Sequence, residues 1–384
     1  MRRQISKPND GKVKVAIVLH GLQSSGGDVL FAHLTHSFDM ERVSITFLLA
    51  VDKNATQLFE ENVIADGAKV IHLHDLRKKQ LVKWPITIYR ALQEYGPFDV
   101  VHANMNVQNG LILKIAKFVG IPARISHAHV SSHLKDHQSM VRGLYLKIMR
   151  QLIHKNATMR IACSDEAGQY FYREDPFTIL PNGIDLSKFR ETRLAHKSNR
   201  SNAYRLITIG RMEQSKNPLF TLDVFEEIHQ QKPETTLTWV GNGSMRDTLV
   251  KHVQEKHLTD CVNFMGQQKH VEAFLDSADI FLFPSLYEGF GLAALEAQAA
   301  GLECYVSDRV PQMVDCGKCH FLSLDLSARG WAEHIIADVE AGTKTELDEE
   351  KLRQFDLSTM AARLTELYTN GAISAEANNA GKTE

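Results

Sequence analysis

Short apolar runs recur along the chain, and stretches with helical spacing of apolar residues lie between them. The first run, residues 13–19, has Lys14 as its only polar residue. A run of this length predicts a strand that is buried on both faces. Further strands are predicted in the first half at residues 44–50, 69–73, 100–103, 123–127 and 160–164, the last of which closes the first domain. Strands that alternate with helices predict an α/β fold with parallel sheets.

The second half of the chain repeats this order. Strands are predicted at residues 205–210, 236–243 (with a glycine turn), 262–266 and 280–283, and helices at 270–278, 292–300 and 358–367. A turn at residues 180–185 separates the halves, because Pro, Asn and Gly favour a turn. We therefore predict domains at residues 1–185 and 186–357, followed by a helix and a polar tail at 358–384. Residues 191–203 and the segment from about residue 370 are polar enough to remain unstructured.

A strand, a glycine loop and a helix follow one another in residues 279–301. The N–H groups of the loop and of the first helical turn point to one place, where the helix dipole favours an anion. Gly289 and Gly291 allow close approach of the backbone, since no Cβ intervenes. Glu288 and Glu296 are better suited to accept hydrogen bonds from hydroxyls than to bind phosphate. Solvated glutamates on a helix are common, but this whole arrangement is not, and it indicates a nucleotide that carries a sugar.

Two further loops follow predicted strands. Arg211 and Lys216 come directly after the strand at 205–210, where a cation pair can neutralise a diphosphate. The first strand leads into a loop that contains Gly26 and Gly27, before a helix predicted from about residue 28. The same phosphate-binding argument applies to this loop. A tight turn without a ligand explains these two glycines equally well.

Histidines lie at the end of the strand at residues 123–127. His127 and His129 share one face of an extended segment. Ligands of open parallel sheets bind beyond the carboxyl ends of the strands, so we expect at least one of the two to face a substrate. Structural hydrogen bonds and metal binding are alternatives that the spacing leaves open.

Positive charge gathers in the first half, where residues 1–185 carry 23 Lys and Arg against 17 Asp and Glu. One basic group alternates with apolar residues, and a second adjoins Trp84; they consist of Lys135, Arg142, Lys147, Arg150, Lys155 and Arg160, and of Lys78, Lys79 and Lys83. Such faces suit an anionic membrane surface or a lipid pyrophosphate, although a solvated helix face explains them equally well. Nucleic acid is disfavoured, because the pI is near neutral and no recognition motif is present.

The chain contains no apolar run as long as a membrane span, and residues 1–10 lack an apolar signal region. We therefore expect a cytoplasmic protein that binds, at most, to the inner face of the plasma membrane. Five cysteines suit a reducing compartment. The motif Cys316-Gly-Lys-Cys319-His320 matches the spacing of haem attachment. We interpret the match as coincidence, because no export signal precedes it and no fourth zinc ligand lies nearby.

Glu288 and Glu296 are separated by seven residues, and Gly-Phe-Gly-Leu follows the first of them. This pattern resembles the Glu-x7-Glu signature of the retaining glycosyltransferases of family four. The Gly-Arg…Lys-Asn residues at 210–217 resemble the donor motif of the same family. The resemblance implies two Rossmann-like domains that face each other across a cleft (the GT-B fold). It also implies a C-terminal donor domain, an N-terminal acceptor domain and a last helix that crosses back to the N-terminal domain.

The resemblance assigns roles to the candidate residues. Arg211 and Lys216 bind the donor diphosphate, Glu288 the sugar hydroxyls and Glu296 the ribose. The catalytic candidates are Glu288, His127, His129, Arg211 and Lys216. The donor-binding candidates are Gly26, Gly27, Gly210, Arg211, Lys216, Asn217, Gly266, Gln267, Glu288, Gly289, Phe290, Gly291, Leu292 and Glu296. We expect no protein nucleophile, no cofactor and, since the chain contains no Asp-x-Asp sequence, no metal.

These residues lead us to expect transfer of a sugar from a nucleoside diphosphate, most simply a UDP-sugar. The acceptor would be a hydroxyl of a saccharide or of a lipid-linked molecule, in capsule or exopolysaccharide synthesis. A nucleotide-sugar epimerase or hydrolase on the same fold, and a non-catalytic nucleotide-sugar-binding protein, are the alternatives. A dinucleotide dehydrogenase is disfavoured, because the glycines at 21, 26 and 27 do not form Gly-x-Gly-x-x-Gly.

Overall fold

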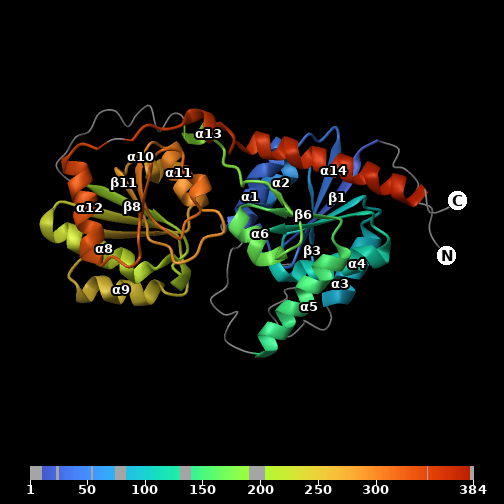
Figure 1. Cartoon of the computed structure of the whole chain (residues 1–384), viewed down its shortest axis with the longest axis horizontal. Helices are drawn as coiled ribbons and strands as arrows, with labels where there is room; N and C mark the ends of the chain where they lie inside the picture. The colour runs from blue at the N-terminus through green and yellow to red at the C-terminus, as the bar shows by residue number, and fades with distance from the viewer. Residues whose placement is uncertain are drawn as a thin grey trace. The chain divides into compact units, whose positions relative to one another are not determined.

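Two parallel sheets organise the chain (Figure 1). The computed structural model describes residues 11–22, 26–52, 55–73, 84–129, 140–189, 204–343 and 345–380. One unit consists of Met1–Gly183 and Leu357–Glu384, and the other of Ile184–Asp356. Each unit has its own sheet and its own core, which confirms the predicted pair of Rossmann-like domains. The predicted linker at 191–203 lies outside the described residues.

The described part of the first unit has a seven-stranded sheet in the order β3-β2-β1-β4-β5-β6-β7, with all neighbours parallel. In this sheet Val15 pairs with Ile45 on one side and with Val100 on the other. The prediction that residues 160–164 form the last strand was wrong, because a two-residue edge strand follows them. The strands are β1 Val13–Leu19, β2 Val43–Leu49, β3 Lys69–His72, β4 Val100–Ala103, β5 Ala123–Ala128, β6 Met159–Ala162 and β7 Thr178–Ile179.

The residues of β1 alternate between two cores. Val15, Ile17 and Leu19 pack on one face with α1, α2 and α14, whereas Ala16 and Val18 pack on the other face with α3 and α4. A strand that is buried on both faces can be apolar along its whole length. This is why continuous apolar runs, rather than alternating patterns, identified the strands. The helices of this unit are α1 Gly26–Leu34, α2 Glu60–Ala65, α3 Trp84–Glu94, α4 Asn109–Val119, α5 Met140–Asn156, α6 Asp165–Tyr172 and α14 Leu357–Ala380, with 3-10 turns η1 Thr35–Ser37 and η2 Asn106–Gln108.

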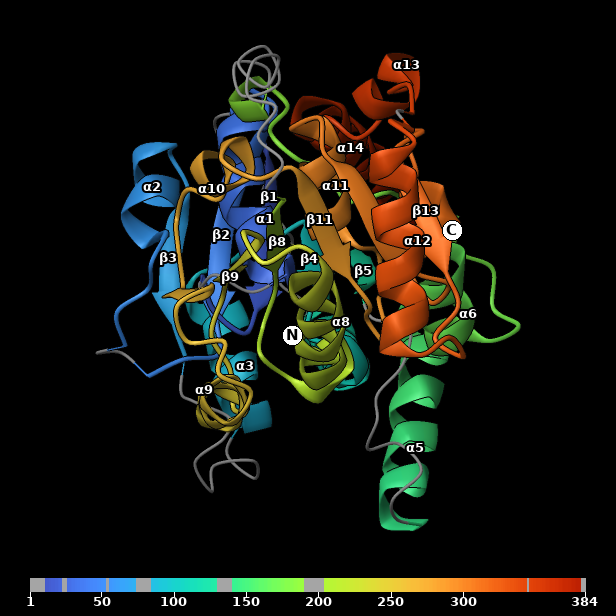
Figure 2. The same cartoon turned by 90° about the vertical axis from the view of Figure 1, so that its left-hand side faces the viewer.

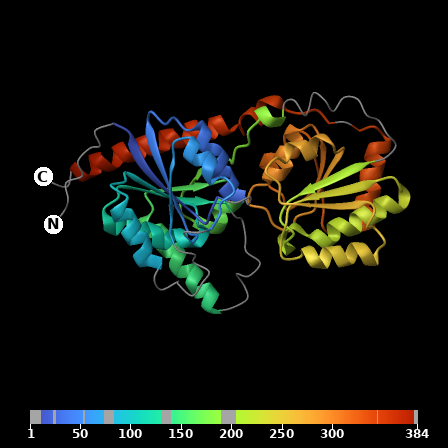
Figure 3. The same ribbon diagram turned by 180° about the vertical axis from the view of Figure 1, so that it is seen from behind.

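The last helix, α14, belongs to the first unit, which confirms the predicted crossing helix (Figure 3). Its buried residues Ala361, Leu364 and Tyr368 recur at intervals of three and four and pack into the core behind β1. The prediction of an unstructured segment from about residue 370 was wrong, since the helix continues to Ala380. The segment is rich in alanine, which has the highest helix propensity. None of the described helices combines the length and apolarity needed to cross a membrane.

The second unit has a six-stranded parallel sheet in its described residues, in the order β10-β9-β8-β11-β12-β13. The helices α8 and α12 lie side by side on one face (Figure 2), where Trp331 is buried against Phe220. The strands are β8 Arg205–Ile209, β9 Thr236–Val240, β10 Val262–Gly266, β11 Ile280–Phe283, β12 Glu303–Ser307 and β13 Cys319–Leu322. The helices are α8 Pro218–Gln231, α9 Arg246–Glu255, α10 Glu272–Asp276, α11 Leu292–Ala299, α12 Ala328–Glu340 and α13 Glu349–Arg353, with 3-10 turns η3 Gln214–Lys216 and η4 Gln312–Val314.

The strands β12 and β13 were not predicted, because polar residues interrupt their apolar pattern. The Cys-x-x-Cys-His residues form the turn into β13. Asp315 Oδ1 accepts hydrogen bonds from the N–H groups of Gly317 and Cys319 at 2.8 and 3.1 Å. Gly317 has φ of +92°, and a Cβ there would lie 2.2 Å from the carbonyl oxygen of Glu346, so only glycine fits. All five cysteines are free thiols.

Glu303 at the start of β12 is the centre of a polar network. Its carboxylate accepts hydrogen bonds from Lys318 Nζ at 2.7 Å and from Thr345 Oγ1 at 2.7 Å, and it lies 3.0 Å from His320 Nε2. Burial raises the pKa of Glu303, but the hydrogen bonds from His320, Lys318 and Thr345 outweigh it and lower this pKa to about 2. The ionised carboxylate therefore stabilises the native state.

We predict that Glu303→Gln lowers the free energy of unfolding by about 2 kcal/mol at neutral pH, because the substitution leaves a partly buried lysine without its counter-charge. The folded-state pKa of Glu303 is depressed, so its contribution is complete above the unfolded pKa and disappears as the pH falls toward 2. Urea titrations of both proteins should therefore converge in acid. Glu333→Gln, which breaks an exposed pair with Arg329, is the control and should change the stability by less than about 0.5 kcal/mol. An equal loss in both variants would contradict the prediction.

Candidate functional site

The strand order of the second sheet reverses between β8 and β11, which are neighbours. In open parallel sheets, ligands bind outside the carboxyl ends of the strands at this point. Residues 210–217 follow β8, and residues 284–291 follow β11. The N–H of Leu286 donates to the carbonyl oxygen of Ser215 at 2.9 Å. The structure thus brings together the two loops that carry most of the donor-binding candidates.

Lys216 and Glu288 form an ion pair between these loops. Their side chains are only 19% and 9% exposed, and Lys216 Nζ lies 4.9 Å from the centre of the Phe283 ring. Burial removes both charges from water at a cost in free energy, and the attraction between the two opposite charges offsets this cost. The cation can bind a phosphate oxygen, and the carboxylate can accept a hydrogen bond from a hydroxyl. Two ligand groups of different chemistry can therefore be held side by side.

Glycines let the backbone segments around Lys216 approach closely. The methylene groups of Lys216 pack over Gly210, where a Cβ would lie 3.7 Å from Lys216 Cε. A Cβ at Gly241 would lie 2.0 Å from the carbonyl oxygen of Gly210, and Gly241 has φ of +141°. The indole N–H of Trp239 donates to the same carbonyl oxygen at 3.2 Å. These contacts fix the backbone that presents Lys216.

The helix α11 starts immediately after Gly291, which has φ of +100°. No described side chain caps this helix. The N–H groups of Ala294 and Leu295 donate to the carbonyl oxygen of Gly291, so those of Leu292 and Ala293 keep their capacity to bind a ligand. Phe290 is buried, and its ring lies 5.8 Å from that of Phe355. Together with the half-buried Gly289, this loop has the order of strand, glycine loop and helix start that the sequence predicted.

Glu296 lies in the middle turn of α11 and is half-buried. Burial and, to a smaller extent, the nearby Glu272 raise the pKa of its carboxyl group to about 7, and Lys188 opposes both. A carboxyl group with this pKa changes its charge near neutral pH. Its capacity to accept hydrogen bonds from hydroxyls changes with it.

Four other donor-binding candidates lie at the same edge of the sheet. Arg211 is exposed and has no ion-pair partner in the part of the chain that the structure describes. Asn217 has a left-handed backbone (φ of 53°) immediately before α8. Gly266 ends β10, and its carbonyl oxygen accepts a hydrogen bond from the N–H of Gly241 at 2.8 Å. Gln267 is exposed.

In the first unit, His127 and His129 belong to a cluster at the carboxyl ends of β4 and β5. Their rings lie 3.9 Å apart, and a hydrogen bond of 3.1 Å joins His127 Nδ1 to His102 Nε2. His129 Nε2 lies 3.0 Å from Asn104 Oδ1. The Phe31 ring lies nearly perpendicular to all three imidazoles. The structural hydrogen bonds that the sequence left open are therefore present.

The histidines of this cluster are neutral at physiological pH. Burial lowers the pKa of His102 to about 3 and that of His129 to about 4. Burial also lowers the pKa of His127 well below its usual range, and the neighbouring His129 and His102 add to this effect. His127 Nε2 is buried without a hydrogen-bond partner among the described residues, so it can bind a polar ligand. The side chain of Asn182 interacts with His129 and partly opposes the effect of burial on its pKa.

Sequence reasoning missed the partners of His127. His102 lies on β4 inside an apolar run, and Tyr368 comes from α14, far away in the sequence; the Tyr368 hydroxyl lies 2.7 Å from His102 Nδ1. A histidine near the carboxyl end of a predicted strand was the sequence feature that could have identified His102.

The prediction that Gly26 and Gly27 lie in a loop was wrong, because they are the first residues of α1. The two glycines therefore belong to the first helical turn, and residues 23–25 lie outside the described residues.

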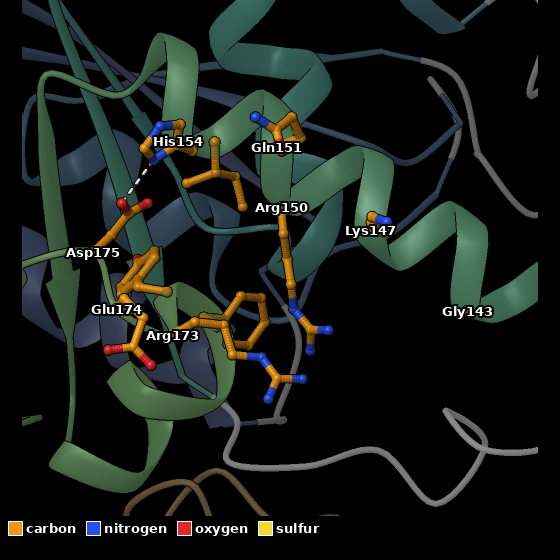
Figure 4. Close-up of a pocket in the computed structure, with 11 residues that line it drawn as sticks. Gly143, Lys147, Arg150, Gln151, His154, Arg173, Glu174 and Asp175 are labelled. Atoms are coloured by element: carbon orange, nitrogen blue, oxygen red, sulfur yellow. Dashed lines mark hydrogen bonds and ion pairs between the residues drawn. The ribbon is translucent and has the colours of Figure 1, made fainter.

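A separate pocket of about 440 Å³ lies between α5 and the end of α6 (Figure 4). Lys147, Arg150 and Arg173 contribute positive charge, and the guanidinium groups of the two arginines point to the same side (Figure 4). Of the acidic lining residues, Asp175 is already paired with His154 at 2.6 Å and with Arg160 at 3.4 Å. None of the donor-binding candidates lines this pocket. Four of the predicted basic residues, at positions 78, 79, 83 and 135, lie outside the described residues.

Comparisons with known proteins agree with this geometry. The family model described as "Glycosyltransferase Family 4" matches residues 24–188, and the model described as "Glycosyl transferases group 1" matches residues 203–340. The chain is 29% identical to EpsF of Bacillus subtilis (strain 168), over 94% of this chain and 97% of EpsF. It is 28% identical to UDP-Gal:alpha-D-GlcNAc-diphosphoundecaprenol alpha-1,3-galactosyltransferase of Escherichia coli, over 58% of this chain and 61% of that protein.

Solved structures share the fold. The crystal structure of Anabaena Alr3699/HepE in complex with UDP and glucose superposes with a TM-score of 0.75 at 15% identity. The superposition covers 93% of this chain and 99% of that protein. The matching models span both sheets, and the Glu-x7-Glu residues lie at the strand-order reversal of the second sheet. The chain therefore belongs to the group 1 glycosyltransferases of family 4, retaining enzymes with the GT-B fold.

Proposed function

We propose that this glycosyltransferase moves a sugar from UDP to a hydroxyl group of a saccharide or lipid-linked acceptor, in the assembly of a capsule or exopolysaccharide. The observation that carries the proposal is the Lys216–Glu288 pair beside the uncapped start of α11. The E. coli relative, whose name includes UDP-Gal, and HepE, solved with UDP and glucose, support a UDP-sugar as donor. The diphosphoundecaprenol in the name of the E. coli relative supports a lipid-linked acceptor.

In this proposal the second unit binds the donor. Lys216, the exposed Arg211 and the first-turn N–H groups of α11 bind the diphosphate, because they place positive charge at the carboxyl ends of β8 and β11. Glu288 accepts hydrogen bonds from the sugar hydroxyls. Glu296 accepts hydrogen bonds from the ribose. Gly266 and Gln267, at the end of β10, lie against the base.

The proposed reaction breaks the bond between C1 of the sugar and the diphosphate. The acceptor oxygen bonds to C1 on the same face, and its proton passes to the departing phosphate, so that the anomeric configuration is retained. Negative charge grows on the leaving phosphate in the transition state. Lys216, Arg211 and the N–H groups of α11 stabilise this charge. The reaction as proposed uses no protein nucleophile, cofactor or metal.

We further propose that the first unit binds the acceptor at an anionic membrane surface, through α5. The exposed fractions of Met140, Leu144 and Ile148 are 94%, 60% and 47%. These residues recur at intervals of four, on one helical face, and α5 extends beyond the rest of its unit (Figures 1 and 2). Lys147, in the adjacent pocket, supplies positive charge next to this apolar face. An exposed apolar face beside cations suits acyl chains beneath anionic headgroups.

We predict that Lys216→Ala, Glu288→Ala and Arg211→Ala each lower kcat/KM for sugar transfer by about 100-fold or more, since each removes a group that binds the diphosphate or the sugar. The measurement is transfer from a panel of UDP-sugars to a labelled lipid-linked acceptor, with circular dichroism to confirm folding. Lys256→Ala, which breaks an exposed pair with Glu226 in the same unit, is the control. Wild-type rates in all three variants would end the proposal. Release of free sugar without acceptor would indicate a hydrolase instead.

We predict that the affinity for a UDP-sugar falls about tenfold between about pH 8 and pH 6. The pKa of Glu296 is raised to about 7 in the free protein, and only the carboxylate accepts two hydroxyl hydrogen bonds, so protonation opposes binding. Calorimetric titration at several pH values measures the effect. Glu296→Gln should bind more weakly at high pH and lose most of the pH dependence. A variant that keeps the wild-type pH dependence would show that Glu296 does not contact the donor.

We predict that Leu144→Glu combined with Ile148→Glu lowers binding to vesicles rich in anionic lipid by about tenfold or more, because two apolar side chains no longer enter the bilayer interface. Co-sedimentation with vesicles measures this binding, which should also weaken as salt is added. Ile64→Glu is the matched control, because Ile64 is 52% exposed on α2 of the same unit. Equal binding by the double variant and the control would remove α5 as the membrane contact.

A further inference from the structure

The buried histidines of the first unit are connected to the C-terminal helix. The Tyr368 hydroxyl on α14 lies 2.7 Å from His102 Nδ1, and His102 Nε2 lies 3.1 Å from His127 Nδ1. All three side chains are fully buried. The chain of hydrogen bonds ends at His127 Nε2, which has no hydrogen-bond partner among the described residues. This atom is the free end of a series of hydrogen bonds that starts on the last helix.

The number of unsatisfied groups indicates the direction of these hydrogen bonds. If Tyr368 donates to His102 Nδ1, then His102 donates from Nε2 and His127 carries its own proton on Nε2. One buried N–H then lacks an acceptor. In the opposite direction, the Tyr368 O–H lacks an acceptor and His127 Nε2 lacks a donor. Because every unsatisfied buried group costs free energy, donation from Tyr368 is favoured.

The ionisation states agree with this direction. Burial raises the pKa of Tyr368 well above its usual range, so the phenol keeps the proton that it donates. The lowered pKa values of His102 and His127 leave one proton on each imidazole, so a single tautomer of each ring satisfies the series. The neighbouring His129 has its Nε2 3.0 Å from Asn104 Oδ1, which can only accept. His129 therefore carries its proton on Nε2.

We infer that Tyr368 and His102 are positioning residues that hold His127 in the tautomer with a proton on Nε2. His127 then acts as a hydrogen-bond donor to an oxygen atom of the substrate and cannot serve as the base that takes the acceptor proton. This inference rests on the proposed function, which supplies the substrate oxygen. The helix α14 thereby takes part in the reaction. Its Tyr368 sets the tautomer of His127 indirectly, through the hydrogen bonds of His102.

The test uses the full-length protein with 15N-labelled histidine, because nitrogen chemical shifts distinguish the two tautomers of a neutral imidazole. We expect His127 to carry its proton on Nε2 in the wild type. In Tyr368→Phe we expect a mixture of tautomers and a kcat/KM about fivefold to tenfold lower, as for the loss of one hydrogen bond. A proton on Nδ1 of His127 in the wild type, or an unchanged tautomer and rate in Tyr368→Phe, would overturn the inference.

Two substitutions of His102 separate positioning from packing. The amide nitrogen of Gln corresponds in position to His102 Nε2 and can still donate to His127, whereas the shorter Asn corresponds only to Nδ1. We therefore expect His102→Gln to keep the His127 tautomer and most of the activity, and His102→Asn to lose both. Equal losses in these two variants would contradict the inference.

Tyr172→Phe is the matched control for the loss of a buried hydroxyl. Tyr172 is buried near the same strands, and its hydroxyl donates to the carbonyl oxygen of Ser126 at 2.7 Å, outside the histidine series. We expect it to lower stability but to leave the His127 tautomer unchanged. The nitrogen spectra report the tautomers in the absence of substrate. If the wild type shows no transferase activity, the proposed function is refuted, and the spectra still test whether Tyr368 and His102 position His127.

Discussion

All strands of a parallel sheet end at the same edge, and this constraint determines where the polar chemistry of this chain can lie. Both faces of each sheet are covered by helices, so the strands themselves are apolar and carry few groups that could react. Polar side chains are concentrated just beyond the carboxyl ends. In the second unit these ends present Lys216 and Glu288, and in the first unit they present His127 and His129. The two units thus apply one architecture to two different sets of polar groups.

Glu303 and Glu296 of the second unit illustrate different solutions to the cost of burying charge. Glu303 is surrounded by three donors from the protein, and its pKa is lowered to about 2, which is typical of a carboxylate whose role is structural. Glu296 has no comparable set of donors among the described residues, and burial raises its pKa to about 7. A carboxyl group that lacks hydrogen-bond donors from the protein is suited to accept hydrogen bonds from a ligand. This contrast supports a donor-binding role for Glu296.

The C-terminal helix connects the last part of the chain to the first. By sequence it is an amphipathic helix with an alanine-rich end, and its apolar stripe explains why it packs into the core behind β1. Tyr368 belongs to that stripe, but its hydroxyl is polar and must find a partner when it is buried. His102 is that partner. Burial of one tyrosine therefore links the packing of this helix to the hydrogen-bonding state of His127.

The sequence by itself determined the strands that are buried on both faces, the division into two α/β halves, an amphipathic last helix and the Glu-x7-Glu loop. These features depend on local patterns: continuous apolar runs, glycine before a helix, and residue types at fixed spacing. Only the tertiary structure decided that Lys216 pairs with Glu288, that Gly241 must be glycine because of Gly210, and that His127 is joined through His102 to Tyr368. These contacts join residues that are between 25 and 266 positions apart. They arise from strand order and register, and no local pattern in the sequence specifies which loops will meet.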